Sequence, residues 1–461
     1  MHQPRPSTIL SIAVLAVGVA LAPANGQGSA VVEFPDPAMF YQNTTFVIDG
    51  DVGYVPSFDN DTLWSFSVVD GVLLDADGLA LPSPGTASDA FIFADGRLAI
   101  PGWFPSQAIY VADISDPTDL SEMGIIPFSA ATNIQGQNVE IDDDGVVGFV
   151  ASFPNDTLYS FNVVTMSLED PDGLTLPGNP DRIARAGDRV AMVDTTNGRI
   201  MVADVTNPAD LLLAGVIELP GSNSFGSNDN IVFADDGRTG FVSSNERVLY
   251  SFDVLTLELL HSGGLVFGAG SFGDHVAIHG DTVACISSSG LSFIDVSDPT
   301  AMSLIANADF GGTIAPQGSA TVAFTADGTM AAIPVVFPGL LVYTFEVATG
   351  VQVADPFLVD AQPNQLTIFG PSDRVGVICS TEATIWLIDG LFPVPLPGDI
   401  DQDGDVDLDD FSLLAGCVNG PDVPAPPSSC DQSNFDRADL DHDDDVDFID
   451  FGLFQVVFTG L

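Results

Sequence analysis

The sequence predicts an all-β protein, an eight-bladed β-propeller, followed by a small C-terminal α-helical calcium-loop domain. Two observations predict the propeller: a unit ending in an aromatic–Ser–Phe strand recurs along the chain, and a second type of unit alternates with it. Self-similarity every 40 to 50 residues or so is typical of propellers and other repeat arrays. A third observation, regularly spaced aspartates after residue 398, predicts the helical domain.

The first type of unit contains DNDTLWSF at 59–66, which returns as PNDTLYSF at 154–161 and more faintly as RVLYSF at 247–252 and LVYTF at 341–345. The second type ends in YVADISDPTDL from Tyr110, MVADVTNPADL from Met201 and SFIDVSDPTAM from Ser292. Equivalent positions are spaced by 42 to 51 residues. These positions are Trp64, Tyr110, Tyr159, Met201, Tyr250, Ser292, Tyr343 and Trp386.

Each unit reads as a four-stranded antiparallel blade. In the third unit, apolar runs are separated by Asp144-Gly145 and Asn155-Asp156, residues that tolerate the backbone angles of tight hairpins. The eighth unit is one strand short, and residues 30–34 can supply that strand and close the ring, which removes exposed sheet edges. We therefore assign residues 30–391 to eight blades, with seven as the alternative if two units merge. The units span 43–85, 88–129, 136–179, 180–221, 228–270, 273–311, 319–359 and 363–391.

Acidic residues dominate the charge of the 461-residue chain, with 64 Asp and Glu against 10 Arg, no Lys, and a net charge of −54. A surface this negative repels nucleic acid and anionic lipid head groups, so we expect neither as a partner. Since self-repulsion destabilises a compact state until ions screen it, the balance suits a saline or divalent-rich setting, or simply an acidic exported protein.

Residues 1–24 have the pattern of a secretory signal peptide. Arg5 gives the positive end, residues 9–21 are apolar, and Ala22-Pro23-Ala24 fits the cleavage pattern. An apolar run of thirteen residues is too short to cross a bilayer, which needs about twenty, and no later stretch is predicted to be a transmembrane anchor. The sequence therefore predicts a secreted protein, extracellular or at the cell surface.

The four cysteines are of two kinds. Cys417 and Cys430 bracket a Pro-rich loop and can form a disulfide in an oxidising compartment. Cys285 and Cys379 lie inside apolar strands of units six and eight, so we expect two buried free thiols.

Few propeller residues suggest catalysis. His275 and His279 lie four apart on one strand, which fits either a pair of imidazoles facing a channel or, as we favour, ordinary strand residues beside turns. No nucleophile elbow or zinc-protease motif occurs in the sequence. We therefore predict no catalytic residue, and an enzymatic activity stays open.

Two other recurring sets have a functional and a structural interpretation. The equivalent acids Asp113, Asp204, Asp295 and Asp389 would either ring a cation or, as we favour, make a repeated structural hydrogen bond. The aromatic set would either stack sugar rings or pack between blades, and its repeated strand position favours packing. That set is Trp64, Trp103, Trp386, Tyr110, Tyr159, Tyr250 and Tyr343.

The tail carries the strongest chemical signal. After a Pro-rich linker at 392–398, 17 of the 64 acids fall between Asp399 and Asp450, in two copies of one pattern. Oxygen ligands at positions 1, 3, 5, 7, 9 and 12 of a twelve-residue loop are typical of calcium sites, with position 7 using its backbone carbonyl. We predict two Ca²⁺ sites. Their residues are Asp399, Asp401, Asp403, Asp405, Asp407 and Asp410, and Asp439, Asp441, Asp443, Asp445, Asp447 and Asp450.

Crowded carboxylates repel one another without a cation, so the tail is predicted to fold only with calcium. Position 6 is Gly404 in the first loop, where the sharp turn needs glycine, but Asp444 in the second, which should weaken that site. An apolar stretch follows each loop, at 411–414 and 451–454, and predicts a short helix.

Two resemblances follow from these residues. The endings at 111–117, 202–208 and 293–299 resemble the LVIVD repeat of bacterial extracellular propellers, a family that implies no settled activity. The duplicated loops at 399–461 resemble a dockerin module, which implies calcium binding and docking on a cohesin-like partner. Positions 10 and 11, Leu408-Asp409 and Phe448-Ile449, depart from the usual Ser/Thr recognition pair, and the insertion between Cys417 and Cys430 departs from the compact form.

The predicted function is therefore a non-enzymatic binding or scaffold protein. Its propeller would present an interaction surface for a glycan or protein, and its tail would attach it to an extracellular assembly. The alternative is a propeller lyase or hydrolase of extracellular polysaccharide breakdown that carries a dockerin.

Overall fold

The structure is a computed structural model. It describes residues 29–35, 40, 44–57, 61–82, 90–102, 108–128, 139–220, 225, 230–268, 273–287, 290–308, 310, 321–336, 339–370, 372–380, 383–392, 398–401, 406–421, 423–430, 432–441, 443 and 445–458, with only the backbone at 154, 273, 274, 433 and 436. The predicted signal peptide and residues 393–397 of the predicted linker lie outside these ranges. The chain divides into two compact units, one ending at Leu391 and one that begins at Phe392 and also includes residues 353–355.

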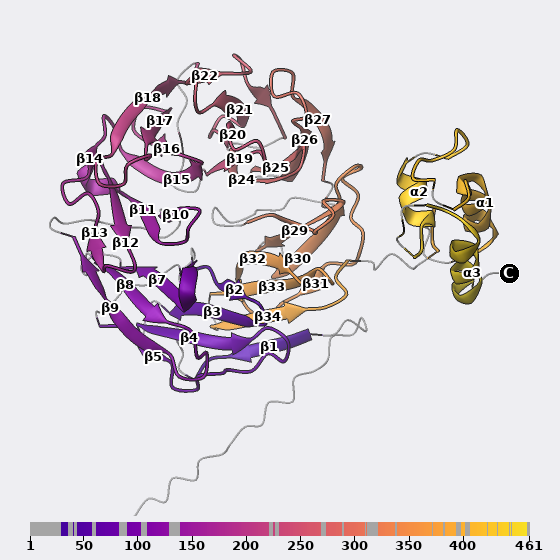
Figure 1. The fold of residues 1–461 in the computed structure, drawn as a ribbon, viewed down its shortest axis with the longest axis horizontal. Coiled ribbons are helices and arrows are strands. Elements are labelled where there is room, and N and C mark those ends of the chain that lie inside the picture. Colours follow the sequence, from indigo (N-terminus) through magenta and orange to yellow (C-terminus); the bar gives the residue numbers. More distant parts are fainter. Residues whose placement is uncertain are drawn as a thin grey trace, which may run out of the picture. The chain divides into compact units, whose positions relative to one another are not determined.

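The first unit is an eight-bladed propeller, as predicted, so the seven-bladed alternative is wrong. Eight antiparallel sheets surround a common centre (Figure 1). Each runs outward in chain order, except that the eighth ends in β1. The inner strands are β2 (Val47–Asp49), β6 (Phe91–Phe93), β10 (Val139–Ile141), β15 (Pro180–Ala186), β19 (Ile231–Phe233), β24 (Gly273–His279), β28 (Ala323–Phe324) and β32 (Pro363–Phe369). The second strands are β3 (Val52–Ser57), β7 (Arg97–Pro101), β11 (Val147–Ser152), β16 (Arg189–Asp194), β20 (Thr239–Ser243), β25 (Thr282–Ser287), β29 (Met330–Val335) and β33 (Arg374–Cys379).

The remaining strands complete the blades, which we number one to eight in this order. The third strands are β4 (Thr62–Ser67), β8 (Ala108–Asp113), β12 (Thr157–Asn162), β17 (Arg199–Asp204), β21 (Val248–Asp253), β26 (Gly290–Asp295), β30 (Leu341–Glu346) and β34 (Thr384–Ile388). The outer strands are β5 (Leu79–Ala80), β9 (Ser121–Pro127), β13 (Ser167–Leu168) with β14 (Leu174–Thr175), β18 (Leu212–Glu218), β22 (Glu258–Leu259) with β23 (Leu265–Val266), β27 (Ser303–Asn307), β31 (Phe357–Leu358) and β1 (Ser29–Glu33). Two 3₁₀ turns, Ala94–Gly96 and Phe153–Asn155, are the only helical segments among the described propeller residues.

The ring closes as the sequence predicts. Strand β1 pairs antiparallel with β34, from Ser29 opposite Ile388 to Glu33 opposite Thr384, so both ends of the propeller share blade eight. This pairing gives the incomplete last blade its fourth strand and removes a break in the ring.

Two blade types alternate around the ring. Blades one, three, five and seven have outer strands of only two residues, and in blades three and five there are two such short strands. Blades two, four and six have outer strands of five to seven residues. A serine of the first type bonds the proline carbonyl that follows the third strand of the next blade, so the repeating unit is a pair of blades. The three bonds, each 2.5 Å long, are Ser65 Oγ to Pro117 O, Ser160 Oγ to Pro208 O and Ser251 Oγ to Pro299 O.

The core lies between neighbouring blades. A glycine on the second strand lies directly under a phenylalanine on the third, and a Cβ added at Gly148 would come within 2.1 Å of the Phe161 ring. Gly53 under Phe66 and Gly240 under Phe252 repeat this contact. Only glycine leaves room for the ring, which explains the Gly and Ser–Phe spacing of the repeat.

Both predictions for the cysteines are confirmed. Cys417 and Cys430 form a disulfide, and their Cα atoms are 4.9 Å apart. Cys285 and Cys379 are free and buried in the propeller.

The second unit contains three helices: α1 (Leu408–Cys417), α2 (Gln432–Ala438) and α3 (Phe448–Val457). The sequence predicted α1 and α3 but not α2, which follows the disulfide loop. Buried Leu414, Phe435 and Phe454 join Val406 and Val446 in a small core. None of the described helices is long and apolar enough to cross a membrane.

Candidate functional site

The helices of the tail hold the ends of the two acidic loops. Asp407 caps α1 and Asp447 caps α3, and each receives a hydrogen bond from the backbone N–H two residues later. Asp410 and Asp450, three residues on, complete both capping boxes. Because loop and helix share these residues, the helix start fixes the last residue of each loop.

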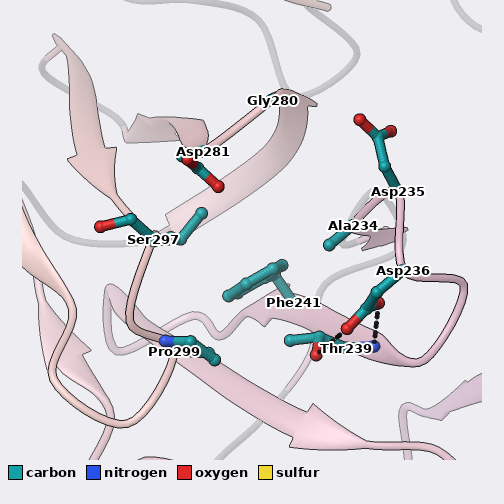
Figure 2. A pocket seen from close by; sticks show the side chains of 10 residues that line it. Ala234, Asp235, Asp236, Thr239, Phe241, Gly280, Asp281, Ser297 and Pro299 are labelled. Carbon is teal, nitrogen blue, oxygen red and sulfur yellow. Dashed lines mark hydrogen bonds between the residues drawn. The ribbon is translucent and has the colours of Figure 1, made fainter.

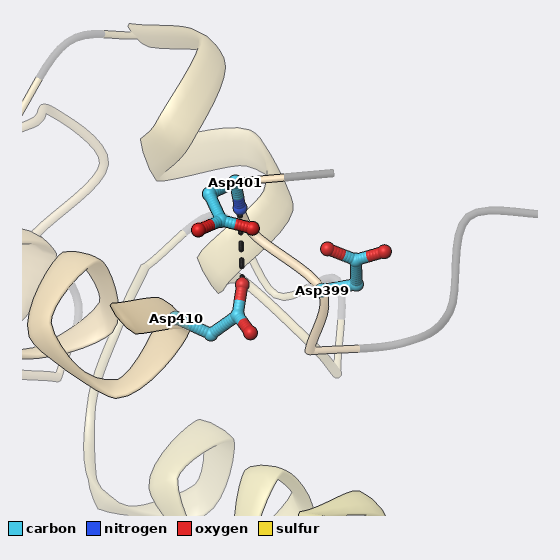
Figure 3. A group of neighbouring side chains, drawn as sticks. All are labelled: Asp399, Asp401 and Asp410. Carbon is cyan, nitrogen blue, oxygen red and sulfur yellow. Dashed lines mark hydrogen bonds between the residues drawn. The ribbon is translucent and has the colours of Figure 1, made fainter. Parts of the chain in front are cut away.

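The first loop brings three predicted ligands together. Carboxylate oxygens of Asp399, Asp401 and Asp410 all lie within 4.8 Å of one another (Figure 3). Asp410 is completely buried, and one of its oxygens accepts from Ile400 N at 2.5 Å and from Asp401 N at 3.0 Å. Figure 3 shows the bond from Asp401. Of the other predicted ligands of this loop, Asp407 caps α1 and is not in this group, whereas Asp403 and Asp405 lie outside the described residues.

The second loop repeats the arrangement. Asp439, Asp441 and Asp450 have oxygens within 4.8 Å of one another, and so do Asp445, Asp447 and Asp450. Asp450 is completely buried and accepts from Leu440 N at 2.7 Å.

Asp443 is the remaining predicted residue of the second loop, and it lies at the loop surface. Its backbone N–H donates to Asp439 at 3.2 Å, while its carboxylate accepts from Asp445 N at 3.3 Å. Asp443 is thus hydrogen-bonded to one acid before it, Asp439, and one after it, Asp445.

The electrostatics of this loop are those of crowded anions. Desolvation and the charges of Asp443 and Asp450 raise the pKa of Asp441 above its usual value. Buried carboxylates need a compensating partner, and hard oxygen donors in such a set favour calcium or magnesium over softer metals. Among the described residues, every group of three acids close enough to share an ion lies in this unit.

An apolar groove of about 320 Å³ lies between α1 and α3. Two other apolar side chains of α3 are unusually exposed, Phe448 at 84% and Val456 at 82%. Exposed apolar clusters of this kind mark interaction surfaces. The groove is lined by Leu408, Phe411, Phe451, Phe454, Gln455 and Phe458.

A pocket of about 360 Å³ lies between blades five and six, beside the acidic turns (Figure 2). Figure 2 shows that the Asp236 carboxylate turns back to Thr239, accepting from its N–H at 2.8 Å and from its hydroxyl at 2.7 Å. Asp235 and Asp281 lie at the rim without forming a group of three with it. This pocket therefore offers no convergent ligand set.

The repeated aspartates of the LVIVD-like endings make structural hydrogen bonds, as the favoured interpretation predicted. Asp113 accepts from both the N–H and the hydroxyl of Ser115, and Asp295 does the same with Ser297. These bonds lower the pKa of both carboxyls. The described members do not form a cation ring.

The aromatic set packs inside the propeller. Trp64, Tyr110, Tyr159, Tyr250 and Tyr343 are all buried. Only Trp386 is partly exposed, and its indole donates to Asp360 at 2.8 Å. Trp103 lies outside the described residues. The described members therefore offer no flat platform for a sugar ring.

A polar group, of which the sequence analysis named only His275, lies where three inner strands begin. Register shifts indicate bulges near the starts of β15, β24 and β32. The residues there are Asp181 and Arg182, both 4% exposed, partly buried His275, and fully buried Asn364. Bulges often re-aim side chains beside functional sites. The recurring starts NPDR, FGDH and QPNQ of these blades were the signal that could have revealed the group.

Burial shifts the pKa of two members of this polar group, His275 and Asp181. Burial, with the nearby charge of Arg182, lowers the pKa of His275 to about 3, so the imidazole is neutral at pH 7. Burial raises the pKa of Asp181 to about 6 although Arg182 opposes it. Neither amide atom of Asn364 finds a partner within the described part of the chain.

The other predicted histidine is apart from this group. The His279 ring packs against Phe324, with ring centroids 6.0 Å apart. Both histidines lie on β24, as the favoured interpretation predicts, and His275 lies beside the bulge near the start of that strand.

The comparisons agree with the repeat analysis. A family model, the LVIVD repeat, matches residues 273–309, which comprise blade six from β24 to β27. The match includes the motif at 293–299 that the sequence analysis singled out. No protein with a curated description matches the sequence.

Among solved structures, the computationally designed Ika8 protein has a TM-score of 0.57 at 12% identity, over 78% of this chain and 99% of that one. The β-propeller domain of Cps50 (Swd1) from Myceliophteria thermophila gives 0.49 at 12% identity, over 66% and 96%. A functionally unknown protein from Desulfotomaculum acetoxidans gives 0.48 at 14% identity, over 67% and 93%. The likeness to Ika8 concerns the fold alone.

Proposed function

We propose that the protein is a secreted binding or scaffold protein whose propeller presents an interaction surface and whose tail attaches it, in a calcium-dependent way, to an extracellular or cell-surface assembly. The observation that carries the proposal is the convergence of three carboxylates in each of the two acidic loops. The fold itself fits a binding role, since propellers serve many functions through their surfaces.

The donor chemistry supports calcium as the ion. Each loop offers only hard oxygen ligands at EF-hand spacing, and the buried Asp410 and Asp450 stand at position 12, where a calcium loop ends. With carboxylates this dense, we expect dissociation constants on the order of 10⁻⁵ to 10⁻³ M. Asp403 and Asp405 would complete the first loop, and the carbonyl of Asp445 the second.

The apolar face of α1 and α3 supports docking through the tail. Phe448 is 84% exposed and lies one helical turn before Phe451, which lines the apolar groove. A cohesin-like partner is the expected class. The face is apolar where the recognition pair is usually Ser/Thr, so the partner surface should be apolar too.

Calcium calorimetry on the full chain tests the first part. We expect two binding events that disappear in the double variant Asp410→Asn/Asp450→Asn. Heat that is the same in both proteins would mean that the ion binds elsewhere on the acidic surface.

Affinity capture of binding partners from the organism's own secreted proteins tests the proposed docking through the tail. A docking partner should bind the wild-type protein with calcium, leave with chelator, and fail to bind Phe448→Ser. The matched control is Val266→Ser, which removes a 66% exposed apolar residue from the propeller instead. Equal loss with both variants would indicate non-specific apolar adhesion.

A second candidate function, a lyase or hydrolase of extracellular polysaccharide, is favoured by the polar group on the inner strands. A neutral imidazole near a guanidinium and a buried carboxyl is a combination suited to proton transfer. Assays for reducing ends and for unsaturated products on a panel of polysaccharides test it. Turnover lost in His275→Ala would establish the enzyme, and a lack of turnover on every substrate would leave the binding protein.

A further inference from the structure

We propose that Asn419 positions the backbone of the second acidic loop for its calcium ion, and that the Cys417–Cys430 disulfide holds Asn419 in place. This inference rests on the calcium binding proposed above. It assigns a role to a residue that belongs to neither loop.

Asn419 and its neighbour engage both backbone groups of Val446, the eighth residue of the second loop. Val446 N donates to Asn419 Oδ1 at 3.3 Å. Val446 O accepts from Asn419 N at 3.1 Å and from Gly420 N at 3.3 Å. Val446 is fully buried, so these bonds form away from water. A segment after α1 therefore fixes the middle of a loop that begins twenty residues later in the sequence.

The bond to Val446 N also sets the direction of a predicted ligand. The Val446 N–H and the Asp445 C=O belong to one planar trans peptide, in which the two groups point in opposite directions. With the N–H aimed at Asn419, the Asp445 carbonyl faces away from it. Position 7 is the loop position that supplies a backbone carbonyl to calcium. Asn419 therefore orients this carbonyl before the ion arrives.

Asn419 is itself rigidly held. Its Nδ2 donates to Val423 O and Ala425 O, both at 2.6 Å, within the Pro-rich loop. That loop is closed by the disulfide, which joins Cys417 to Cys430 over a separation of 13 residues. A short covalent loop restricts the chain around Asn419, so little ordering is left for the moment of ion binding.

Gly420 makes the approach to Val446 possible. Its φ is +94°, a conformation that residues with side chains rarely adopt. The chain can therefore turn directly after Asn419, so that two successive N–H groups reach the same carbonyl.

The second loop has a particular need for this support. The first loop has Gly404 at position 6, the place of the sharp turn, whereas the second has Asp444. The sequence therefore predicts a weaker second site, and the hydrogen bonds from Asn419 and Gly420 to Val446 fix the backbone of this loop from outside it. The insertion that departs from the compact dockerin form thus serves the weaker loop.

The test is a calcium titration of the full chain in two backgrounds. Asp401→Asn weakens the first loop, so the remaining site reports the second, and Asp441→Asn does the reverse. In the first background, Asn419→Ala should weaken binding about tenfold or more, the usual cost of losing a group that orients a ligand. In the second background, the same change should leave the affinity unchanged, which also verifies that the unit is folded.

Asn419→Asp separates the two contacts of this side chain, the one that orients the Val446 peptide and the ones that hold Asn419 against the Pro-rich loop. It keeps an oxygen that accepts from Val446 N but loses both donors to the Pro-rich loop. We expect it to retain most of the second-loop affinity and the slow hydrogen exchange of the Val446 amide, whereas Asn419→Ala loses both. Cys417→Ser/Cys430→Ser should weaken the second loop in the same direction as Asn419→Ala.

Two results overturn the inference alone: unchanged second-loop affinity in Asn419→Ala, or equal weakening by Asn419→Ala and Asn419→Asp. Absence of calcium binding in the parent protein would remove the proposed function, and the inference with it. The two failures are therefore distinguishable.

Discussion

Aspartate has opposite roles in the two units of this protein. In the propeller, Asp116 and Asp298 each accept from the N–H and the hydroxyl of the threonine two residues later. In the tail, Asp399, Asp401 and Asp410 crowd together within 4.8 Å. Local partners satisfy the first kind, whereas the second kind forms the crowded group for which we propose a calcium ion.

The largest expected effect separates these two roles directly. Asp450→Asn removes a buried charge from the second acidic loop and should lower its calcium affinity about 100-fold, because loss of a group that holds or orients a metal ion commonly weakens binding by roughly 10- to 100-fold. Asp298→Asn, an exposed turn acid of the propeller, should leave calcium binding unchanged. Calorimetry on both variants measures the difference, and a similar loss in the two would erase the distinction between the units.

A second prediction concerns packing, which holds the propeller independently of ions. Gly148→Ala drives a methyl group into the Phe161 ring, at a built distance of 2.1 Å, and should destabilise the propeller by about 1 to 3 kcal/mol. The cost should be the same with calcium and with chelator.

Thermal unfolding measures this cost. Gly263→Ala is the matched control, because a Cβ at Gly263 meets nothing within 4 Å. A calcium-dependent cost of Gly148→Ala would mean that the propeller also relies on bound ions.

Glu140 on β10 differs from the turn acids Asp116 and Asp298 of the propeller, because its burial disfavours the charged carboxylate. Burial raises its pKa to about 7, although Arg185 opposes the shift. A carboxyl whose folded pKa lies above its unfolded value lowers stability as the pH rises from the unfolded value through 7.

Glu140→Gln should therefore stabilise the propeller at pH 8, by roughly 1 to 3 kcal/mol because one pKa unit corresponds to about 1.4 kcal/mol. It should have no effect near pH 4. Chemical denaturation at both pH values checks this, and an equal effect at the two would show that packing rather than charge is responsible.

The smallest expected effect is that acid changes the stability of the propeller and of the calcium-free tail in opposite directions. Hydrogen bonds lower the pKa of Asp116 and Asp298, so their contribution is present above the ordinary Asp pKa of about 3.9 and is lost as the pH falls through the folded value. Desolvation and neighbouring acids raise the pKa of Asp441, so protonation relieves the calcium-free tail as the pH falls.

Acid should therefore weaken the propeller while increasing helix in the calcium-free tail. Circular dichroism during an acid titration in chelator follows both changes. A loss of helix between pH 7 and 5 would contradict the repulsion ascribed to the tail.

Much of the architecture was predictable because it repeats. The Ser–Phe spacing gave the blades, and the short last unit indicated closure by residues 30–34, which pair with β34. The acidic spacing identified the residues that converge in the tail. Each of these signals is a pattern in the chain that local chemistry enforces.

The features that were missed depend on irregularities instead. Asp181 and Arg182 lie where β15 slips register, and no periodicity marks a bulge. Helix α2 has only seven residues, and its place is fixed by Phe435 and Ala438 in the tail core rather than by propensity. Asn419 lies in a loop whose partner, Val446, is distant in sequence. Tertiary contacts decided all three.

The central claim is that the tail depends on an ion and the propeller does not. Hydrogen exchange of the full chain, with calcium and with chelator, tests it most directly. The account predicts that amides of α1 and α3 are protected only with calcium, while β-strand amides of the propeller exchange equally slowly in both. Equal protection of α1 and α3 in the two states would contradict it.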